Sequence, residues 1–437
     1  MKILIISKEA WRDEQNGGNV LSNMFSQLPN AEFAQIYCNE QEPNNAICCN
    51  YYQMSDRMMV NNILYRTHVG RKLVYDKVPT STIATKESFK MVGGKLGGNL
   101  KRMARELVWA IGRWDEKEIV EYACEFNPDI LFAPCYGNHY MQKLTALVHD
   151  ALGVAVVSYI SDDFYTNKQF KLSPVFWLNH LLIRCRTRKI FRHYSLVYTM
   201  TDEQKQQCER DFGANMKILR KNGQFEEQYL KKAVNDPIRF VYAGGIYLNR
   251  WKTLGALAKA MRHINVDGVR MVLDVYTNNQ LDTQMQQAIN DGRTARVHKA
   301  VAMDELIGIY HQSDVALHVE AFDVTNRHVV RMSFSTKIVD CMDSGCAVMA
   351  VCDEKQAGGS YLRRNNCAIC IHDMMRIESV LRDIVAHPEK LVEMQHKAFE
   401  VGRKYHLQEN ITKELINDFE SCLLYTSPSP RDRQKSR

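Results

Sequence analysis

Short runs of β-branched and aliphatic residues alternate with helical patterns along most of the chain, and this alternation constrains the fold more than any other feature. Strands separated by amphipathic helices pair most simply as parallel neighbours, because each helix returns the chain to the same edge of the sheet. We predict strands at 3–6, 33–37, 130–133, 155–160, 196–199, 238–242, 271–276, 295–298, 315–318, 347–351 and 368–371. We predict helices in the second half at 254–263, 303–312, 335–343, 377–386 and 391–405. The sequence therefore predicts an α/β protein with mostly parallel sheets.

A chain of 437 residues exceeds what one hydrophobic core usually organises, so we expect two Rossmann-like domains. A polar stretch that starts near Asn222 separates the two alternating halves. We predict an N-terminal domain over 1–222 and a C-terminal domain over 223–405. A helix over 406–421 is expected to pack back on the N-terminal domain. Residues 422–437 resemble translated sequencing-adapter read-through, and we expect a non-native tail there. The segment 50–113 has no regular pattern.

Cysteine usage and the lack of certain sequence motifs narrow the possible classes of function. The 13 cysteines form no paired framework, which is typical of reduced thiols in a cytoplasmic protein. No Asp-x-Asp signature stands in a suitable place, so we expect no metal ion. We also expect no bound cofactor and no nucleic-acid partner. No apolar run approaches the length of a membrane span, which needs about 18 residues.

A first candidate site is Gly17-Gly18, after the first predicted strand and before a helix that is expected to start near Asn19. Glycines allow close backbone approach, and a helix start offers unpaired N–H groups to an anion. The pair is not a Gly-x-Gly-x-x-Gly fingerprint, and a plain flexible turn is the alternative. We assign Gly17 and Gly18 to a loop in the first domain, on the side where a second substrate, the acceptor, is expected to enter.

A second motif joins paired glycines to two cations. Gly244 and Gly245 end a predicted strand, and Arg250 and Lys252 stand at the entrance of the next helix. Backbone room, helix-end N–H groups and fixed positive charge are what a diphosphate group requires. The alternative interpretation is a solvated basic turn.

A third motif starts with a buried strand that ends at Glu320 and continues with a helix marked by Ser335 and Thr336. Lys337 lies in the first turn and Asp340 about one turn further, so helical spacing predicts that both face one side. The motif delivers a carboxylate to the end of a sheet beside a capped helix. The alternative is that each of these charges is a solvated or capping residue.

Together the motifs resemble the donor-binding domain of the retaining glycosyltransferases of family four. The likeness is strongest over 240–351, in the glycine turn followed by Arg-Trp, in DVALHVEAF at 314–322 and in STKI at 335–338. The resemblance implies the GT-B fold, in which two Rossmann-like domains with mostly parallel sheets face each other across a cleft.

The resemblance also implies roles for individual residues. Arg250 matches the cation that neutralises the donor diphosphate, with Lys252 as a second cation. Glu320 matches the acidic residue that contacts the donor sugar, and Asp340 stands where relatives bind the ribose hydroxyls. Val301 falls in the loop that brackets the nucleobase.

The chain departs from the family at several positions. The two acidic positions lie farther apart here because 322–334 is inserted, and the second is aspartate rather than glutamate. Cys346-Ala347 replaces the usual x-Pro. Many relatives have a histidine after the strand that corresponds to 155–160, whereas this chain has Asp162 and Asp163. We take these two aspartates as catalytic candidates on the acceptor side.

These features predict a hexosyl-type glycosyltransferase that moves a sugar from a nucleotide-diphosphate donor to a hydroxyl acceptor. The family resemblance implies retention of configuration and a role in cell-surface polysaccharide or glycolipid synthesis, with a sugar or a lipid-linked acceptor. Two alternatives stay open. One is a sugar-nucleotide epimerase of the same fold, and the other is a catalytically silent binding subunit.

The run 176–192 is apolar in its first half and basic in its second. This pattern suits a helix that lies at an anionic membrane surface, so we predict peripheral contact with the inner face of the cytoplasmic membrane. The alternative is a core helix whose residues Phe176, Leu178, Leu181 and Leu182 pack on the N-terminal sheet.

Overall fold

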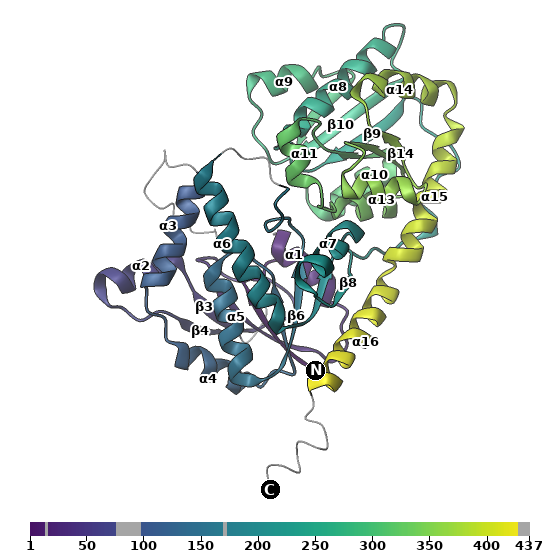
Figure 1. Ribbon diagram of the computed structural model, residues 1–437. Coiled ribbons are helices and arrows are strands. Elements are labelled where there is room, and N and C mark those ends of the chain that lie inside the picture. The colour runs from purple at the N-terminus through teal and green to yellow at the C-terminus, as the bar shows by residue number, and fades with distance from the viewer. Residues whose placement is uncertain (14–15, 76–97, 169–172, 427–437) are drawn as a thin grey trace.

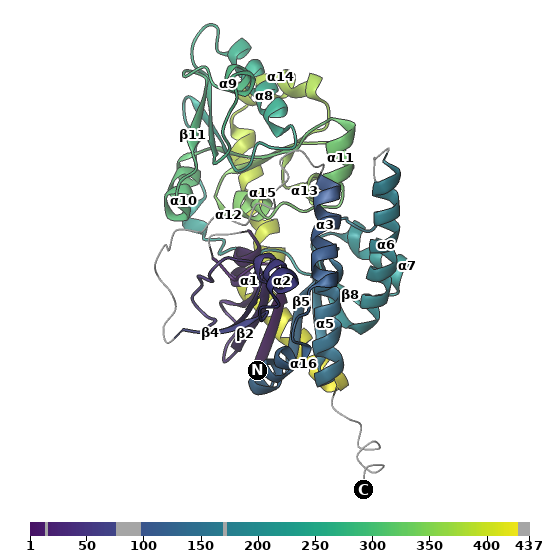
Figure 2. The same ribbon diagram turned by 90° about the vertical axis from the view of Figure 1, so that its left-hand side faces the viewer.

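Two parallel sheets, each flanked by helices, form the protein (Figures 1 and 2). The structure is a computed structural model that describes residues 1–13, 16–75, 98–168 and 173–426. Within these residues the first sheet has eight strands in the order β4-β3-β2-β1-β5-β6-β7-β8. The second has six in the order β11-β10-β9-β12-β13-β14. All neighbours are parallel except β3 and β4, which run antiparallel.

The first sheet contains β1 (Lys2–Ser7), β2 (Glu32–Cys38), β3 (Asn50–Met54), β4 (Arg71–Val74), β5 (Ile130–Pro134), β6 (Ala155–Ile160), β7 (Tyr194–Thr199) and β8 (Met216–Ile218). Its helices are α1 (Asn16–Phe25), α2 (Asp56–Tyr65), α3 (Gly98–Ile111), α4 (Glu116–Phe126), α5 (His139–Leu152), α6 (Pro174–Ile190) and α7 (Asp202–Phe212). Strands β1, β2, β5, β6 and β7 are almost continuously buried, as expected for a parallel sheet that is covered on both faces.

The second sheet contains β9 (Ile238–Ala243), β10 (Met271–Thr277), β11 (Ala295–Lys299), β12 (Val315–Val319), β13 (Ala347–Val351) and β14 (Ile369–Ile371). Its helices are α8 (Arg250–Ile264), α9 (Thr283–Ile289), α10 (Met303–Gln312), α11 (Val324–Val330), α12 (Lys337–Asp343), α13 (Ala357–Arg364), α14 (Ile377–Ala386) and α15 (Glu389–His406). Every strand predicted from the alternation is present, with small differences at the ends. The sequence pattern missed β3, β4 and β8.

Each sheet has one point where the strand order reverses. In the first sheet this point lies between β1 and β5, and in the second it lies between β9 and β12. The loops that leave the two central strands turn to opposite faces there, so a crevice opens outside their carboxyl ends. The fold therefore offers one ligand position in each domain.

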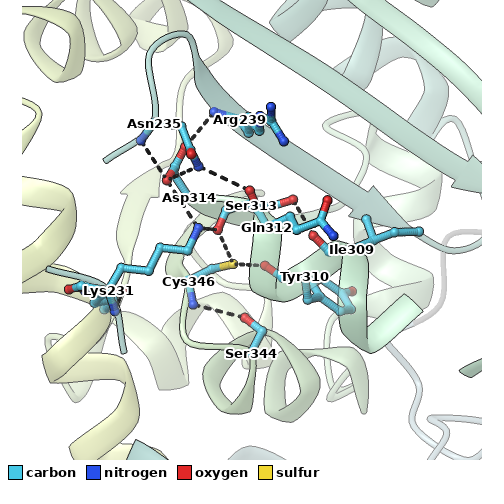
Figure 3. A network of polar contacts seen from close by, with 11 residues as sticks. Lys231, Asn235, Arg239, Ile309, Tyr310, Gln312, Ser313, Asp314, Ser344 and Cys346 are labelled. Atoms are coloured by element: carbon cyan, nitrogen blue, oxygen red, sulfur yellow. Dashed lines mark hydrogen bonds and ion pairs between the residues drawn. The ribbon is translucent and has the colours of Figure 1, made fainter. Parts of the chain in front are cut away.

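A buried polar network fixes the start of β12 (Figure 3). The Asp314 side chain is 2% exposed, and it accepts hydrogen bonds from the backbone N–H of Arg239 (2.8 Å) and from Asn235 Nδ2 (2.8 Å). Lys231 pairs with the same carboxylate, and the Cys346 thiol donates to the Ser313 carbonyl at 3.1 Å. The network ties residues 231–235, which lead into the second sheet, to the base of the strand that ends beside Glu320.

The two chain segments that pass between the domains are hydrogen-bonded to each other. The Gly223 N–H donates to the His406 carbonyl (2.9 Å), and the Gln408 N–H donates to the Gly223 carbonyl (3.1 Å). Beside this crossing, Asn222 and Asn23 of α1 bind each other through their side chains and through the Asn23 backbone. The crossing is thus a short bridge between residue 223 and residue 407.

The last helix, α16 (Gln408–Thr426), returns from the second domain to the first sheet (Figure 1). Phe419 is fully buried, with its ring centroid 6.3 Å from that of Phe25. The helix continues through Thr426, and Cys422 is buried in the core. The expected tail boundary at residue 422 therefore falls inside a packed helix, and only residues 427–437 of the expected tail lie outside the described residues.

We expect Asp418→Ala to destabilise the protein by about 1–3 kcal/mol, because Asp418 anchors α16. Its carboxylate accepts a hydrogen bond from the buried Tyr198 hydroxyl (2.8 Å) and pairs with Lys217. Urea unfolding measures the change. Asp418→Asn keeps an acceptor for Tyr198 and should lose less. Equal stability of the wild type and the alanine variant would show that the helix is held by apolar packing alone.

Helix α6 exposes much of its apolar surface. Leu178, Leu181 and Leu182 are each about half exposed or more, so they do not pack on the first sheet. Phe176 is half-buried, and its ring stacks on that of His180 at 5.6 Å between centroids. The alternative of a core helix is therefore wrong for the three leucines.

Candidate functional site

The glycine turn after β9 lies against a lysine from α12. Gly244 has a φ of +144°, which favours glycine, and a Cβ at this position would lie 1.5 Å from Lys337 Nζ. A Cβ on Gly245 would lie 2.2 Å from the ring of Tyr247. Both glycines thus leave room for the side chains that converge on the turn.

A buried ion pair joins the start of α8 to the end of β12. Arg250 Nε and Nη2 each donate to one oxygen of Glu320 at 2.8 Å, in the two-pronged geometry that suits a guanidinium and a carboxylate. The side chains are only 13% and 5% exposed. The Tyr247 ring lies 5.0 Å from the guanidinium, and the Thr253 hydroxyl donates to the Glu320 carbonyl at 2.9 Å. The pair stands at the strand reversal of the second sheet.

Lys337 is the second cation at this position. Its ammonium lies 5.2 Å from the centre of the Tyr242 ring. Burial, followed by the charge of Arg250, lowers the pKa of Lys337 to about 8. Lys252, the second cation expected from the sequence, is instead exposed at the surface, with its ammonium 5.5 Å from the Trp251 ring.

The remaining donor-side residues lie around α12 and in one neighbouring loop. The helix begins at Lys337, so Ser335 and Thr336 precede its first turn, and Thr336 makes no side-chain cap. Asp340 pairs with Lys221 of the interdomain segment. Lys337 and Asp340 thus contact different elements, although the charge of Asp340 acts on Lys337. Val301 lies half-buried in the loop between β11 and α10.

The two acceptor-side aspartates have different surroundings. The Asp163 side chain is 1% exposed, accepts from the Thr166 N–H (3.0 Å) and hydroxyl (2.6 Å), and pairs with Arg331 of the second domain. These contacts give Asp163 a structural role between the domains. Asp162 is exposed and lines a cavity, and its pKa is raised by desolvation and by the charge of Asp163. A catalytic role remains a prediction for Asp162 and for Asp163.

Gly17 and Gly18 lie inside the first turn of α1 and not in a loop before it. The helix starts at Asn16, three residues earlier than expected. The helix buries Leu21, Met24 and Phe25 in the core, and this packing outweighs the weak helix propensity of glycine. The expected acceptor-side loop is therefore corrected to a helix start.

Sequence reasoning missed a cavity of about 520 Å³ at the strand reversal of the first sheet. Residues that follow β1, β5 and β6 line it, together with α3 and α6. Helix α3 falls in the segment without a regular pattern, so no motif pointed to it. Arg331 was missed as well, because it lies in the segment 322–334 that has no counterpart in the family pattern.

Two further observations concern the described residues. No three or more His, Cys, Asp or Glu side chains come together there as a metal-ion site. No helix in the described ranges has both the length and the apolar character to cross a membrane.

Comparison with known proteins defines the fold. No family model and no curated protein sequence matches the chain, but solved structures match it over nearly its whole length. The chain has the GT-B glycosyltransferase fold. The sequence identities to the structures described next are 13% or lower, so this likeness concerns the fold alone.

Three solved structures illustrate the match. HepE from Anabaena in complex with UDP is 13% identical, with a TM-score of 0.58 over 96% of this chain and 100% of that chain. Sucrose-phosphate synthase from Thermosynechococcus elongatus is 11% identical, with a TM-score of 0.60 over 98% and 100%. The E. coli structure described as trehalose-6-phosphate bound with UDP-2-fluoro glucose is 9% identical, with a TM-score of 0.55 over 96% and 99%.

Proposed function

We propose that the chain is a glycosyltransferase that moves a sugar from a nucleoside-diphosphate sugar to a hydroxyl acceptor. One observation carries the proposal: Arg250, Glu320 and Lys337 converge on a glycine turn at the strand reversal of the second sheet. The fold supports it, since similar structures hold UDP and UDP-glucose. The finer proposal is a retaining enzyme of family four in polysaccharide or glycolipid synthesis at the cytoplasmic face of the membrane.

In this proposal the donor diphosphate lies between Arg250 and Lys337. The backbone of Gly244 and Gly245 allows it to approach closely, and Ser335 and Thr336, which precede α12, contact it through their side chains. Negative charge grows on the leaving diphosphate during transfer, and two fixed cations stabilise that charge without reorganising. The protein thus supplies the positive charge itself.

The carboxylates take the other roles. Glu320 contacts the donor sugar once the diphosphate competes for Arg250. Asp340 binds the ribose hydroxyls in exchange for Lys221, and Val301 brackets the nucleobase. Asp162, whose pKa is raised, is suited to receive the proton of the acceptor hydroxyl, because a raised pKa brings a carboxylate nearer to the working pH.

The proposal is tested by nucleotide binding followed by turnover. UDP, GDP and ADP and their sugars are screened by thermal shift, where a ligand at about 100 times its Kd stabilises the protein by roughly 2.7 kcal/mol. The stabilising donor is then incubated with acceptors, and the products are separated by mass and by sugar identity. Transfer or donor hydrolysis supports a transferase, and a changed sugar on the intact nucleotide indicates an epimerase. Binding without turnover indicates a silent subunit.

We expect the affinity for the nucleotide to fall as pH rises above about 8. A diphosphate favours the protonated ammonium, and the pKa of Lys337 is lowered from 10.5 to about 8, so above that pH binding must take up a proton. The fall is up to about tenfold per pH unit. Calorimetry between pH 6.5 and 9.5 measures it, and Lys337→Met is the control, with weaker binding and no such slope.

The same lysine makes a second, opposite contribution to stability. Because its folded pKa lies below its unfolded value, the unfolded chain binds more protons between about pH 8 and 10.5. The stability of the unliganded protein therefore gains from Lys337 as pH rises through that window. Lys337→Met should melt higher than wild type at pH 7, and a lower melting temperature would contradict the burial of a charge here.

We also propose that α6 contacts an anionic membrane surface. Its exposed apolar residues are Val175, Leu178, Leu181 and Leu182, and its exposed basic residues are Arg188 and Lys189. A cation near such a surface contributes about 1 kcal/mol, so binding should weaken with salt. Flotation with anionic and neutral liposomes tests this, with Leu178→Gln/Leu182→Gln as the variant that should detach. Equal flotation with both liposome types would remove the proposal.

A further inference from the structure

The cavity at the strand reversal of the first sheet contains positive charge that donor binding does not use. It measures about 520 Å³ and lies at the carboxyl ends of β1, β5 and β6. Ligands of open parallel sheets bind at this kind of position. Asp162 lines one wall, and the neighbouring Asp163 contacts Arg331 of the second domain, so this wall adjoins the donor-binding half of the protein.

Three cations line the cavity: Lys8 after β1, Arg102 on α3 and Arg186 on α6. Each is without an ion-pair partner among the residues that the structure describes. Burial lowers the pKa of Lys8, and the charges of Arg105 and Arg102 lower it further. Burial, followed by the charge of Arg186, likewise lowers the pKa of His139 at the start of α5. Like charges therefore converge on this cavity from three separate elements, an arrangement that favours an anion.

The other charged side chains of the cavity wall either have protein partners or form no ion pair with the three cations. Arg105 donates to Asp56 at 2.9 Å and lies 5.4 Å from the Tyr140 ring. Glu106 accepts from Asn138 Nδ2 (2.8 Å) and the His139 N–H (2.9 Å), so it holds the start of α5.

Glu9 is exposed and forms no ion pair with Lys8. Its charge only partly opposes the lowering of the Lys8 pKa. Asp162 has a raised pKa. Neither carboxylate neutralises Arg102 or Arg186.

We infer that this cavity binds an acceptor that carries a phosphate group, with Lys8, Arg102 and Arg186 holding the phosphate. The inference rests on the proposed transferase function and adds the chemical class of the acceptor. The phosphate stays intact in the reaction, and a hydroxyl elsewhere on the same molecule accepts the sugar. A soluble sugar phosphate and a lipid phosphate share this chemistry.

Calorimetric titration of the full chain tests the inference. The probes are glucose 6-phosphate, glucose and a short-chain phosphatidic acid, each with and without saturating UDP. Arg102→Gln and Arg186→Gln should each weaken binding of the phosphate probe about tenfold or more, because each removes a charge-assisted contact. Lys101→Gln, which changes an exposed cation on α3 outside the cavity, should stay within about twofold of wild type.

The probes separate the two sources of phosphate. Binding of glucose 6-phosphate but not glucose supports a soluble acceptor, and binding of phosphatidic acid alone supports a lipid-linked one. Binding should also weaken as salt is raised, because the contacts are ionic.

Three outcomes would overturn the inference: no phosphate probe binds, the cavity variants bind as wild type does, or UDP displaces the probe. UDP affinity is measured on the same samples. If the wild-type protein does not bind UDP, the proposed function is removed. The cavity variants, by contrast, should bind UDP with unchanged affinity.

Discussion

Replacing Glu320 with glutamine is expected to lower kcat/KM for sugar transfer by about 10²–10³-fold, the usual effect of removing one preorganised electrostatic contact at a reacting centre. The amide has the shape of the carboxylate, and its single oxygen can still accept from one of the two Arg250 donors, so the fold should survive with lower stability. The variant loses the negative charge that, in the proposed function, faces the donor sugar. Steady-state kinetics measures the rate, and the melting curve reports folding.

Asp323→Asn makes the same acid-to-amide change three residues away and serves as the matched control. Asp323 caps α11 and accepts from Asn249 at 3.0 Å, contacts that asparagine can largely keep. Its activity should stay close to wild type. Full activity in the Glu320 variant would mean that another group contacts the donor sugar.

The second large effect is on stability and concerns Arg250→Ala. This variant leaves Glu320, whose side chain is 5% exposed, without its ion-pair partner, and breaking a buried pair from one side typically costs about 3–5 kcal/mol. Nucleotide affinity should fall too, since a charge-assisted contact with phosphate contributes about 1.5–3 kcal/mol. Urea unfolding and calorimetry measure the two losses on one preparation.

Two further variants separate the causes. Arg250→Met combined with Glu320→Leu removes both charges and should recover most of the stability, yet it should neither bind the donor normally nor transfer sugar. Arg262→Ala breaks the more exposed pair with Asp291 and should change stability by less than about 1 kcal/mol. A double variant as unstable as Arg250→Ala would show that the lost stability does not come from the unpaired charge.

The sequence predicted the second domain well because its elements have strong local signals. The helix predicted over 303–312 coincides with α10, and the strand over 347–351 coincides with β13. The first domain was harder where elements depend on distant partners. β4 is a four-residue edge strand that is mostly exposed, so no alternation of apolar residues marks it. Helix α3 follows a stretch without periodicity.

The sequence predicted those residues of the candidate site that belong to recognisable motifs. The motifs joined Arg250 and Glu320 to one site, but helical spacing alone could not show that Lys337 extends to Gly244 while Asp340 turns to Lys221. Tertiary contacts decide such directions. The cations of the first-domain cavity come from three elements far apart in the chain, so no local pattern connects them.

The two interdomain segments cross at one place, which is the natural pivot for any relative movement of the domains. Residues 231–235 are bound to Asp314 on one side, and α16 is bound to Tyr198 on the other, so each connection is fixed to its domain close to residues 223 and 407. Rotation about this point leaves nearby contacts such as Asn23–Asn222 almost unchanged. Helix α11, which Arg331 follows, lies on the far side of its domain from the α15–α16 junction (Figure 1). A separation of the domains about this point would therefore have to break the Asp163–Arg331 ion pair, which lies away from the crossing.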